Sequence, residues 1–210
     1  MKVIGITGPT GAGKTTALGA LVALGGEIID ADAVYHELTA SSDALRQELT
    51  QRFGPVYENG QLARKKLGAI VFQDPAALED LNAITHKYIS QAVGARLDAA
   101  RAQGRPAAAI DAIALLEGGL LDFCDCTVAI TAPEDLRIRR IMAREGISEE
   151  YARMRVSAQQ SSEWFQARCD YCLENNEGDT PEGFAQRAQT LFREIIALPA
   201  GKPKAGALHP

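Results

Sequence analysis

The sequence predicts an α/β fold in which a parallel sheet of about five strands carries helices on both faces. Two observations predict it. Apolar runs of strand length alternate with longer helical patterns along the chain, which is typical of parallel sheets. The first apolar run, at 2–7, leads straight into a glycine-rich segment and then into a helical pattern. With 210 residues, 46% of them hydrophobic, the chain can bury the core of one such domain, which we expect over 1–198.

The amino-terminal half is predicted to hold two strands and a series of helices. Gly25-Gly26 ends the first helix, and Ser41-Ser42-Asp43 caps a later one. Asn59-Gly60 marks a turn, and Asp74-Pro75 interrupts the last helical pattern. In chain order we expect a strand at 2–7, a helix at 16–24, a strand at 27–30, helices at 30–38 and 43–53, a turn-rich connection at 56–62, and a helical pattern from 64 that stops at Gly104 and Pro106.

The carboxy-terminal half continues the alternation. Pro133 is predicted at the first position of a helix, where its missing N–H is not needed. Ser148 starts a further helix that reaches about residue 160. The tail at 199–210 is predicted to be disordered. The expected strands lie at 107–111, 127–131 and 171–173, and the last helix at 181–198 turns Phe184, Ala188, Leu191, Phe192 and Ile195 inward.

Residues Gly8–Thr15 form a complete GxxxxGK[ST] phosphate-binding loop between the first strand and the first helix. Glycines let backbone N–H groups point inward around phosphates without Cβ clashes, and the helix N-terminus meets the anion. In such a loop Lys14 bridges the β and γ phosphates, and the Thr15 hydroxyl holds Mg²⁺. The loop therefore predicts a nucleotide enzyme or a nucleotide switch.

Composition and charge exclude some classes of partner. The net charge of −5 argues against a general nucleic-acid binder, whose phosphate contacts need a basic surface. No long apolar span is visible, so we expect no membrane association and a cytoplasmic protein. The sequence does not indicate the oligomeric state.

Four cysteines form two close pairs, Cys124 with Cys126 and Cys169 with Cys172. Thiolates from two short clusters could complete a zinc site. We favour the alternative that the thiols pack as small hydrophobic groups in or beside short strands, since a CxC spacing is unusual for structural zinc. A persistent disulfide is not expected in a reducing compartment, and a response to oxidation is left open.

Aspartates follow two of the predicted strands. Ligands of an open parallel sheet bind beyond the carboxyl ends of its strands, where the phosphate loop and Asp30-Ala31-Asp32 both lie. A kinase acting on an alcohol needs a carboxylate that orients the acceptor hydroxyl and takes its proton. We assign that role to Asp32 and expect Asp30 to cap the following helix. Asp111 either holds a Mg²⁺-bound water, as a Walker B aspartate does, or caps the loop after its strand; we favour the first.

Further segments follow the Asp-Ala-Asp in a definite order. They are His36-Glu37-Leu38, Gly60 to Leu67 with Val71-Phe72, Leu81 to His86, Asp111 to Glu117, Arg140 and Arg144 with Arg155 and Gln159, and Asp170 to Asn175. This succession resembles the dephospho-CoA kinase family, which phosphorylates the ribose 3′-hydroxyl of dephospho-CoA in the last step of coenzyme A synthesis. The similarity spans about residues 1–195. Only the phosphate loop is generic, and the ordered succession behind it carries the specificity.

The resemblance implies a three-layer P-loop kinase with ATP as donor, Mg²⁺ as cofactor and dephospho-CoA as acceptor. It implies a helical acceptor-side region at 60–104 and an Arg-rich lid at 137–160. Asp32 inherits the role of catalytic base, while Lys14 and Arg140 stabilise the transferring phosphoryl group. It implies that Arg64, His86 and Glu117 bind the acceptor, and that Thr15 and, through a water, Asp111 hold the metal. The residues implied to bind ATP are Gly8, Gly11, Ala12, Gly13, Lys14, Thr15, Thr16 and Arg144.

For some residues the resemblance gives no role, and at some positions this sequence departs from the family. Arg137 and Arg139 are interpreted as ordinary solvent-exposed helix arginines. Lys87 and Ile113 stand where the family has prolines, and Cys169 takes an alanine position. Lost prolines change loop stiffness more than chemistry, and here they bear on the shape of the acceptor pocket. His86 is left open between an acceptor-side hydrogen-bonding group and a buried histidine with its hydrogen bonds satisfied.

Three other functions remain as alternatives. A nucleoside monophosphate or shikimate kinase would share the loop and lid but not the Asp-Ala-Asp with the later segments. A guanine-nucleotide switch would usually carry an N/T-K-x-D motif, which is not found in the sequence. A non-catalytic nucleotide-binding homologue is disfavoured because Lys14, Thr15 and Asp32 are all present.

Overall fold

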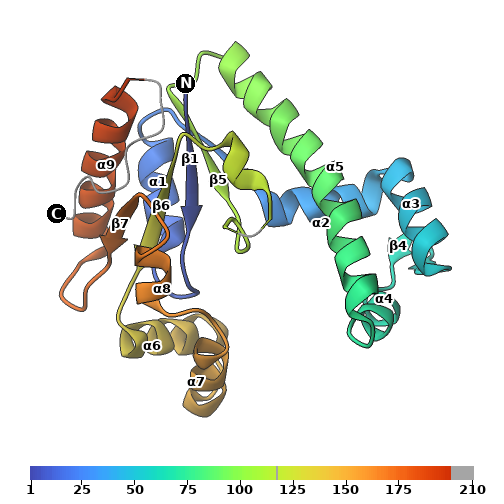
Figure 1. Ribbon diagram of the computed structural model, residues 1–210. Helices are drawn as coiled ribbons and strands as arrows, with labels where there is room; N and C mark the ends of the chain where they lie inside the picture. Colours follow the sequence, from blue (N-terminus) through green and yellow to red (C-terminus); the bar gives the residue numbers. More distant parts are fainter. Residues whose placement is uncertain (117, 200–210) are drawn as a thin grey trace. The chain divides into compact units, whose positions relative to one another are not determined.

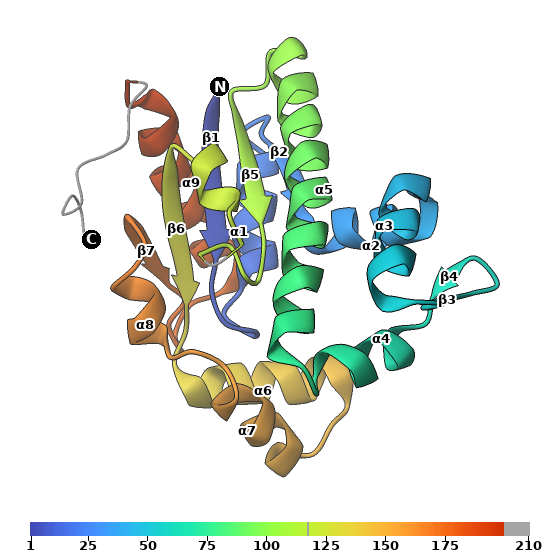
Figure 2. The ribbon, with the colours of Figure 1, turned by 45° about the vertical axis from the view of Figure 1, so that its right-hand side comes forward.

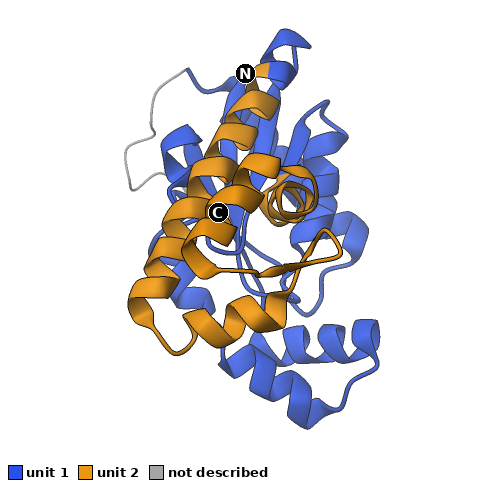
Figure 3. Cartoon of the chain, turned by 90° about the vertical axis from the view of Figure 1, so that its right-hand side faces the viewer, with its two compact units in different colours: residues 1–29, 99–210 blue, residues 30–98 orange. Residues whose placement is uncertain are grey.

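The computed structural model describes residues 1–116 and 118–199, which form two compact units (Figure 3). Unit 1 comprises residues 1–29 and the chain from residue 99 onward. Unit 2 comprises residues 30–98. Glu117 and the tail at 200–210, for which we predict disorder, lie outside the described residues.

Unit 1 is built on a five-stranded sheet with the order β2-β5-β1-β6-β7 (Figure 1; all five strands are labelled in Figure 2). The central strand β1 pairs in parallel with β5 and β6, and β6 pairs in parallel with β7. Every residue of β1 and β6 is buried, as expected of strands covered on both faces. The predicted α/β class and parallel sheet are confirmed. The strands are β1 Lys2–Thr7, β2 Glu27–Asp30, β5 Ala107–Asp111, β6 Cys126–Thr131 and β7 Tyr171–Glu174.

Two helices build the main core of unit 1 against this sheet (Figure 2). The helix α1 (Lys14–Val22) lies beside α9 (Pro181–Ala197), and both contribute apolar side chains to a cluster with alternate residues of β1 and β6. The five residues predicted to face inward on the last helix are all buried in this cluster. The packing fixes the start of α1, and therefore the phosphate loop that precedes it, on the sheet.

The remaining elements of unit 1 come after β5 or after β6 in the sequence. A 3₁₀ turn, η1 (Leu120–Phe123), precedes β6, and α6 (Glu134–Glu145) follows it. The lid region contains α6 and α7 (Glu149–Ser157), which pack on each other through Ile138, Ile141, Ala152 and Val156. The short helix α8 (Ser162–Gln166) contacts β6.

Unit 2 is helical apart from one short hairpin. Its core joins apolar residues of α3, α4 and the start of α5, among them Leu49, Leu67 and Ala77. The helix α5 is long and continues beyond unit 2 to Ala102. The elements are α2 Ala31–Ser41, α3 Asp43–Phe53, β3 Tyr57–Glu58, β4 Gln61–Leu62, α4 Arg64–Val71 and α5 Pro75–Ala102.

Three local predictions differ from the structure. The turn-rich connection at 56–62 is a hairpin, because Asn59 and Gly60 adopt positive φ angles of 49° and 79° that suit a tight two-residue turn. Pro133 precedes α6 as its N-cap, since its ψ of 142° is extended rather than helical. The helix predicted from Ser148 ends at Ser157, and Ser161 caps a separate α8 that was not predicted. Among the described helices, none is long and apolar enough to cross a membrane.

Candidate active site

The phosphate-binding loop connects β1 to α1 at the carboxyl edge of the sheet. Gly13 precedes α1 with a φ of 103°, and a Cβ at this position would lie 2.4 Å from the Nδ2 atom of Asn175. Only glycine therefore allows the loop to approach the end of β7 so closely. A helix N-terminus leaves N–H groups of its first turn without partners in the helix, so the start of α1 beside the loop suits a bound anion.

A cavity of about 300 Å³ lies over this loop. Residues 9–15 line it, together with Arg140 and Arg144 from α6. The Nζ atom of Lys14 donates a hydrogen bond to the carbonyl oxygen of Gly8 at 3.2 Å. Three cationic side chains thus meet the loop N–H groups in one cavity, which suits the triphosphate of a nucleotide.

Arg140 is fixed to the loop by hydrogen bonds. Its guanidinium donates to the carbonyl oxygen of Gly11 at 3.3 Å and to Oδ1 of Asn175 at 3.0 Å. Burial lowers the pKa of Arg140, although the guanidinium stays charged at neutral pH. Its orientation is therefore set before a nucleotide binds.

Asn175 was assigned no role from the sequence. It is 5% exposed, directly follows β7, and its Nδ2 atom donates to the carbonyl oxygen of Ala12 at 3.1 Å. Because its Oδ1 atom also accepts a hydrogen bond from Arg140, the amide of Asn175 links the phosphate loop to α6. Two features of the sequence point to Asn175: its place at the carboxyl end of a predicted strand, and its position at the end of the segment Asp170 to Asn175, which contributes to the resemblance.

Arg137 is not a solvent-exposed arginine, so that interpretation is wrong. It is 3% exposed, and its Nε donates to the carbonyl oxygen of Thr10 at 2.9 Å while its terminal nitrogen donates to Oε1 of Gln159 at 2.8 Å. Gln159 also accepts from the Thr10 N–H and donates to the Thr10 hydroxyl, at 3.1 and 2.8 Å. Burial lowers the pKa of Arg137. The three residues clamp the phosphate loop to α6 and to the segment after α7.

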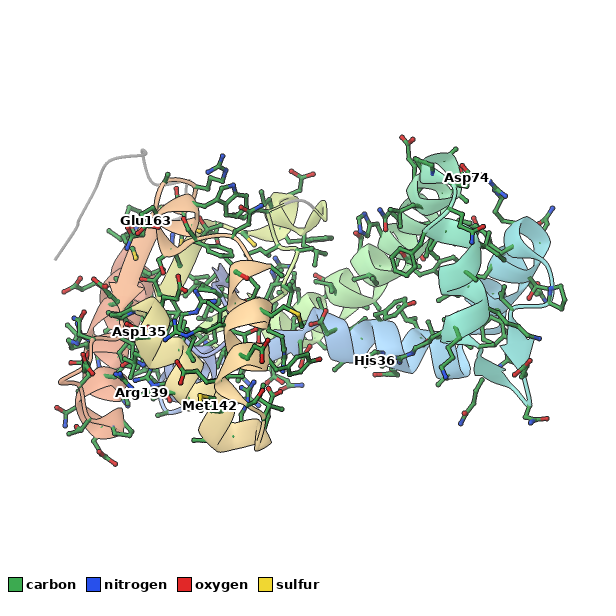
Figure 4. The ribbon with its side chains drawn as sticks, turned by 90° about the horizontal axis from the view of Figure 1, so that it is seen from below. His36, Asp74, Asp135, Arg139, Met142 and Glu163 are labelled. Atoms are coloured by element: carbon green, nitrogen blue, oxygen red, sulfur yellow. The ribbon has the colours of Figure 1, made fainter. Side chains whose placement is uncertain are left out.

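Replacing Arg137 by alanine should lower the free energy of unfolding by about 2 kcal/mol, because it removes buried packing together with the hydrogen bonds to the carbonyl oxygen of Thr10 and to Oε1 of Gln159. Arg139 is the matched control on the same helix. It projects into solvent, where it pairs with Glu177, and its removal should cost less than about 1 kcal/mol (Figure 4). Urea denaturation compares the two variants; equal losses would contradict the clamp.

Arg144 and Arg155, which lies on the following helix α7, both donate to the carboxylate of Glu145. Arg144 donates to one oxygen of Glu145 at 2.6 Å, and Arg155 pairs with the other oxygen. Hydrogen bonds from Arg144 and Arg155 hold the pKa of Glu145 below its usual range. The side chain of Arg144 is 60% exposed, so it can exchange this partner for a phosphate in the same cavity.

Thr15 and Asp111 supply the hard oxygen atoms that Mg²⁺ prefers. Thr15 is exposed on the first turn of α1 and lines the phosphate cavity, and Thr16 follows it, half-buried, on the same turn. Asp111 ends β5 and lies in register with Ile6 of β1. The donor atoms stand at the carboxyl ends of adjacent strands, one of which carries the phosphate loop, and they fit a nucleotide-bound magnesium ion.

The other predicted site residues that the structure describes belong to unit 2. Oδ1 of Asp30 accepts from the N–H of Ala33 at 2.9 Å, which confirms that this aspartate caps α2. Asp32 lies in the first turn of α2 with an exposed side chain. Arg64 donates to Nδ1 of His36 at 2.9 Å, and both line a cavity of about 270 Å³. His86 is half-buried on α5, whereas Glu117 lies outside the described residues.

The cysteines have the environment of packed thiols. Burial raises the pKa of Cys126 to about 12 and that of Cys169 to about 11, which keeps both protonated at neutral pH. Zinc binds thiolates rather than thiols. Within 1–116 and 118–199, His, Cys, Asp and Glu side chains form no group of three or more that could hold a metal ion.

Comparison with known proteins places the chain among small-molecule kinases. The family model described as dephospho-CoA kinase matches residues 2–181. A dephospho-CoA kinase from Anaeromyxobacter dehalogenans is 36% identical over 197 residues, which are 93% of this chain and 92% of that protein. A crystal structure from Thermus thermophilus aligns with a TM-score of 0.74 at 28% identity, covering 92% of this chain and 97% of that one. A dephospho-CoA kinase structure from Campylobacter jejuni shares the fold, with a TM-score of 0.66 at 24% identity over 93% and 98% of the two chains.

Proposed function

The chain belongs to the dephospho-CoA kinase family, and from that membership we propose how its residues transfer the terminal phosphoryl group of ATP to the ribose 3′-hydroxyl of dephospho-CoA. The family sets the activity, the use of ATP and the acceptor. What the residues of this chain contribute is argued from their chemistry and their contacts.

The donor half of the proposal rests on the cavity over the phosphate loop. Lys14, Arg140 and Arg144 supply positive charge beside the loop N–H groups, so the triphosphate of ATP is bound along Gly8, Gly11, Ala12, Gly13, Thr15 and Thr16. Arg140 is held by the loop and by Asn175, so it offers a fixed charge to the transferring phosphoryl oxygens. Arg144 is the adjustable cation of the lid at 137–160: it leaves Glu145 for the phosphates when ATP binds and so helps to exclude water.

We assign the nucleotide-bound Mg²⁺ to the Thr15 hydroxyl and, through a water, to the Asp111 carboxylate. When bound, this ion neutralises charge on the phosphates. The oxygen donor set described above supports the assignment.

The acceptor half rests on Asp32. A carboxylate that takes a hydroxyl proton must be accessible to the acceptor, and Asp32 is exposed two residues beyond the end of β2, whereas Asp30 is occupied as the helix cap. Deprotonation of the ribose hydroxyl during attack on the γ-phosphorus then completes an in-line transfer, with ADP as the leaving group.

Unit 2 is proposed to recognise the rest of the acceptor. Arg64 is an exposed cation beside His36, suited to a phosphate of dephospho-CoA, and His86 is a second polar group on the same unit. We keep Glu117 as a third acceptor residue on the basis of the sequence alone. These assignments extend the predicted acceptor-side region at 60–104.

Coupled measurement of ADP release tests the function, with dephospho-CoA, nucleoside monophosphates and shikimate as parallel acceptors. We expect turnover that depends on Mg²⁺ and on dephospho-CoA, with the other acceptors near the background rate. Reactions without an acceptor measure that background, and the product is identified by its mass. Turnover only with a nucleoside monophosphate or with shikimate would refute the proposal.

A further inference from the structure

A second cavity adjoins the phosphate loop within unit 1. Its volume is about 260 Å³, and Pro9, Thr10 and Lys14 line both this cavity and the one that we assign to the ATP phosphates. A ligand in the second cavity would therefore meet the lysine that holds the transferring phosphoryl group. Arg64 and His86 belong to unit 2 and do not line this cavity, so the acceptor residues that the structure describes leave its role open.

The far wall of the second cavity is apolar and aromatic. It includes Ile113 and Leu116 from the segment after β5, and Trp164 and Phe165 from α8. Ile113 is 71% exposed, an unfavourable position for a large apolar side chain unless a ligand covers it. The lining favours a ligand with a flat, weakly polar surface.

Trp164 is held in place by its neighbours. Its ring meets Phe165 edge to face with the centroids 5.0 Å apart, and the guanidinium of Arg168 lies 4.4 Å from the indole centroid. Trp164 remains only half-buried. An indole that is fixed on its protein side and open to a cavity is a stacking surface for a planar group.

The polar lining has one amide available for hydrogen bonds. Gln159 is engaged by Thr10 and Arg137, as described above. Gln160 is exposed and also lines the cavity. A primary amide presents a donor and an acceptor together, which matches the paired edge of a nucleobase.

We propose that this cavity binds the adenine base of dephospho-CoA, with Trp164 stacked on the base and Gln160 at its edge. The inference rests on the proposed function. The base is attached to the same ribose as the reacting hydroxyl, so it must lie close to the transferring phosphoryl group and Lys14. The pantetheine arm is separated from that ribose by two phosphates and has no aromatic ring to stack. Trp164 is then a specificity-determining residue for the acceptor.

Trp164 is the single tryptophan of the chain, so its fluorescence reports directly on the cavity. The full-length protein is first saturated with a non-hydrolysable ATP analogue and then titrated with dephospho-CoA or with 4′-phosphopantetheine, which lacks the nucleoside. We expect saturable quenching by dephospho-CoA and no change with 4′-phosphopantetheine. Equal quenching by both would assign the cavity to the arm and overturn the proposal, as would an unchanged signal from an enzyme that turns over dephospho-CoA.

Kinetics of Trp164→Ala give a second readout. Loss of the stacked indole should raise the KM for dephospho-CoA about tenfold and leave the KM for ATP within about twofold, while Trp164→Phe should recover most of the loss. Tyr151→Ala is the matched control, since Tyr151 is an exposed aromatic residue on α7 that does not line the cavity. Thermal unfolding of each variant checks that the fold is retained.

The outcomes separate the inference from the proposed function. If the wild-type protein does not phosphorylate dephospho-CoA, the function itself fails. If it does, and Trp164→Ala folds with an unchanged KM for dephospho-CoA or with equal rises in both KM values, only the adenine site is refuted.

Discussion

Replacing Asp32 by asparagine is expected to lower kcat about 10³-fold while the affinity for ATP stays nearly unchanged. Asparagine keeps the size of the side chain and its place on the first turn of α2, but it cannot take the proton of the acceptor hydroxyl. The phosphate cavity, with Lys14, Arg140 and Arg144, contains no atom of Asp32. Steady-state turnover with dephospho-CoA measures the first effect, and equilibrium titration with an ATP analogue measures the second.

Asp30→Asn is the control for this experiment. Asp30 stands two residues earlier and caps α2, a role that asparagine performs about as well as aspartate. We therefore expect turnover within about twofold of the wild type, since the helix start is kept. If Asp32→Asn turns over at the wild-type rate, the assignment of the base is wrong. If both variants lose activity equally, the loss belongs to the start of α2 rather than to proton transfer.

Replacing Gly8 by alanine is expected to destabilise unit 1 by about 3 kcal/mol or more and to abolish ATP binding at ordinary concentrations. Gly8 has a φ of 142°, which a side chain rarely allows, and a Cβ at this position would lie 2.0 Å from the carbonyl oxygen of Ile130 in β6. Because that oxygen belongs to a sheet strand and cannot rotate away, the phosphate loop would have to lift off the sheet.

Gly19→Ala is the matched control. Gly19 lies on the exposed side of α1, where a Cβ would meet no atom within 4 Å, so alanine should stabilise the helix by about 0.5 to 1 kcal/mol. Urea denaturation should show that the free energy of unfolding falls for Gly8→Ala and rises for Gly19→Ala, and nucleotide titration should show a loss of ATP binding for Gly8→Ala alone. A Gly8→Ala protein with wild-type stability would contradict the close approach of the loop to β6.

The strands could be predicted from sequence because each is a short apolar run with a clear boundary. The runs at 27–30 and 107–111 are bounded by glycine or proline on one side and end at an aspartate, and the structure has strands at those positions. The hairpin at 57–62 could not be predicted in the same way. Its strands are two residues long, too short for an alternating pattern, although the Asn59-Gly60 turn was visible.

The buried polar residues of the candidate site could not be predicted from local sequence. Arg137 has the spacing of an exposed helix arginine, and its burial depends on Thr10, which lies 127 positions away. The burial of Asn175 likewise depends on its contact with Ala12, which lies 163 positions away. The sequence pattern around a residue reports helix faces and strand faces, whereas these contacts arise only when distant segments pack together. The phosphate loop and the cap at Asp30 could be predicted because both depend on neighbouring residues.

The central place of β1 also bears on how the chain is made. Both of its neighbours in the sheet, β5 and β6, are synthesised after it, so Lys2 can pair only once Ala107 has been made, and Ile4 only once Cys126 has been made. Six residues that are all buried in the finished protein are thus unpaired during much of translation, a period in which chaperones protect such segments from aggregation. Asn175, which holds the phosphate loop and Arg140, is synthesised later still. A nascent chain that stops short of this residue carries every residue of the glycine loop but lacks the amide that fixes its lid arginine.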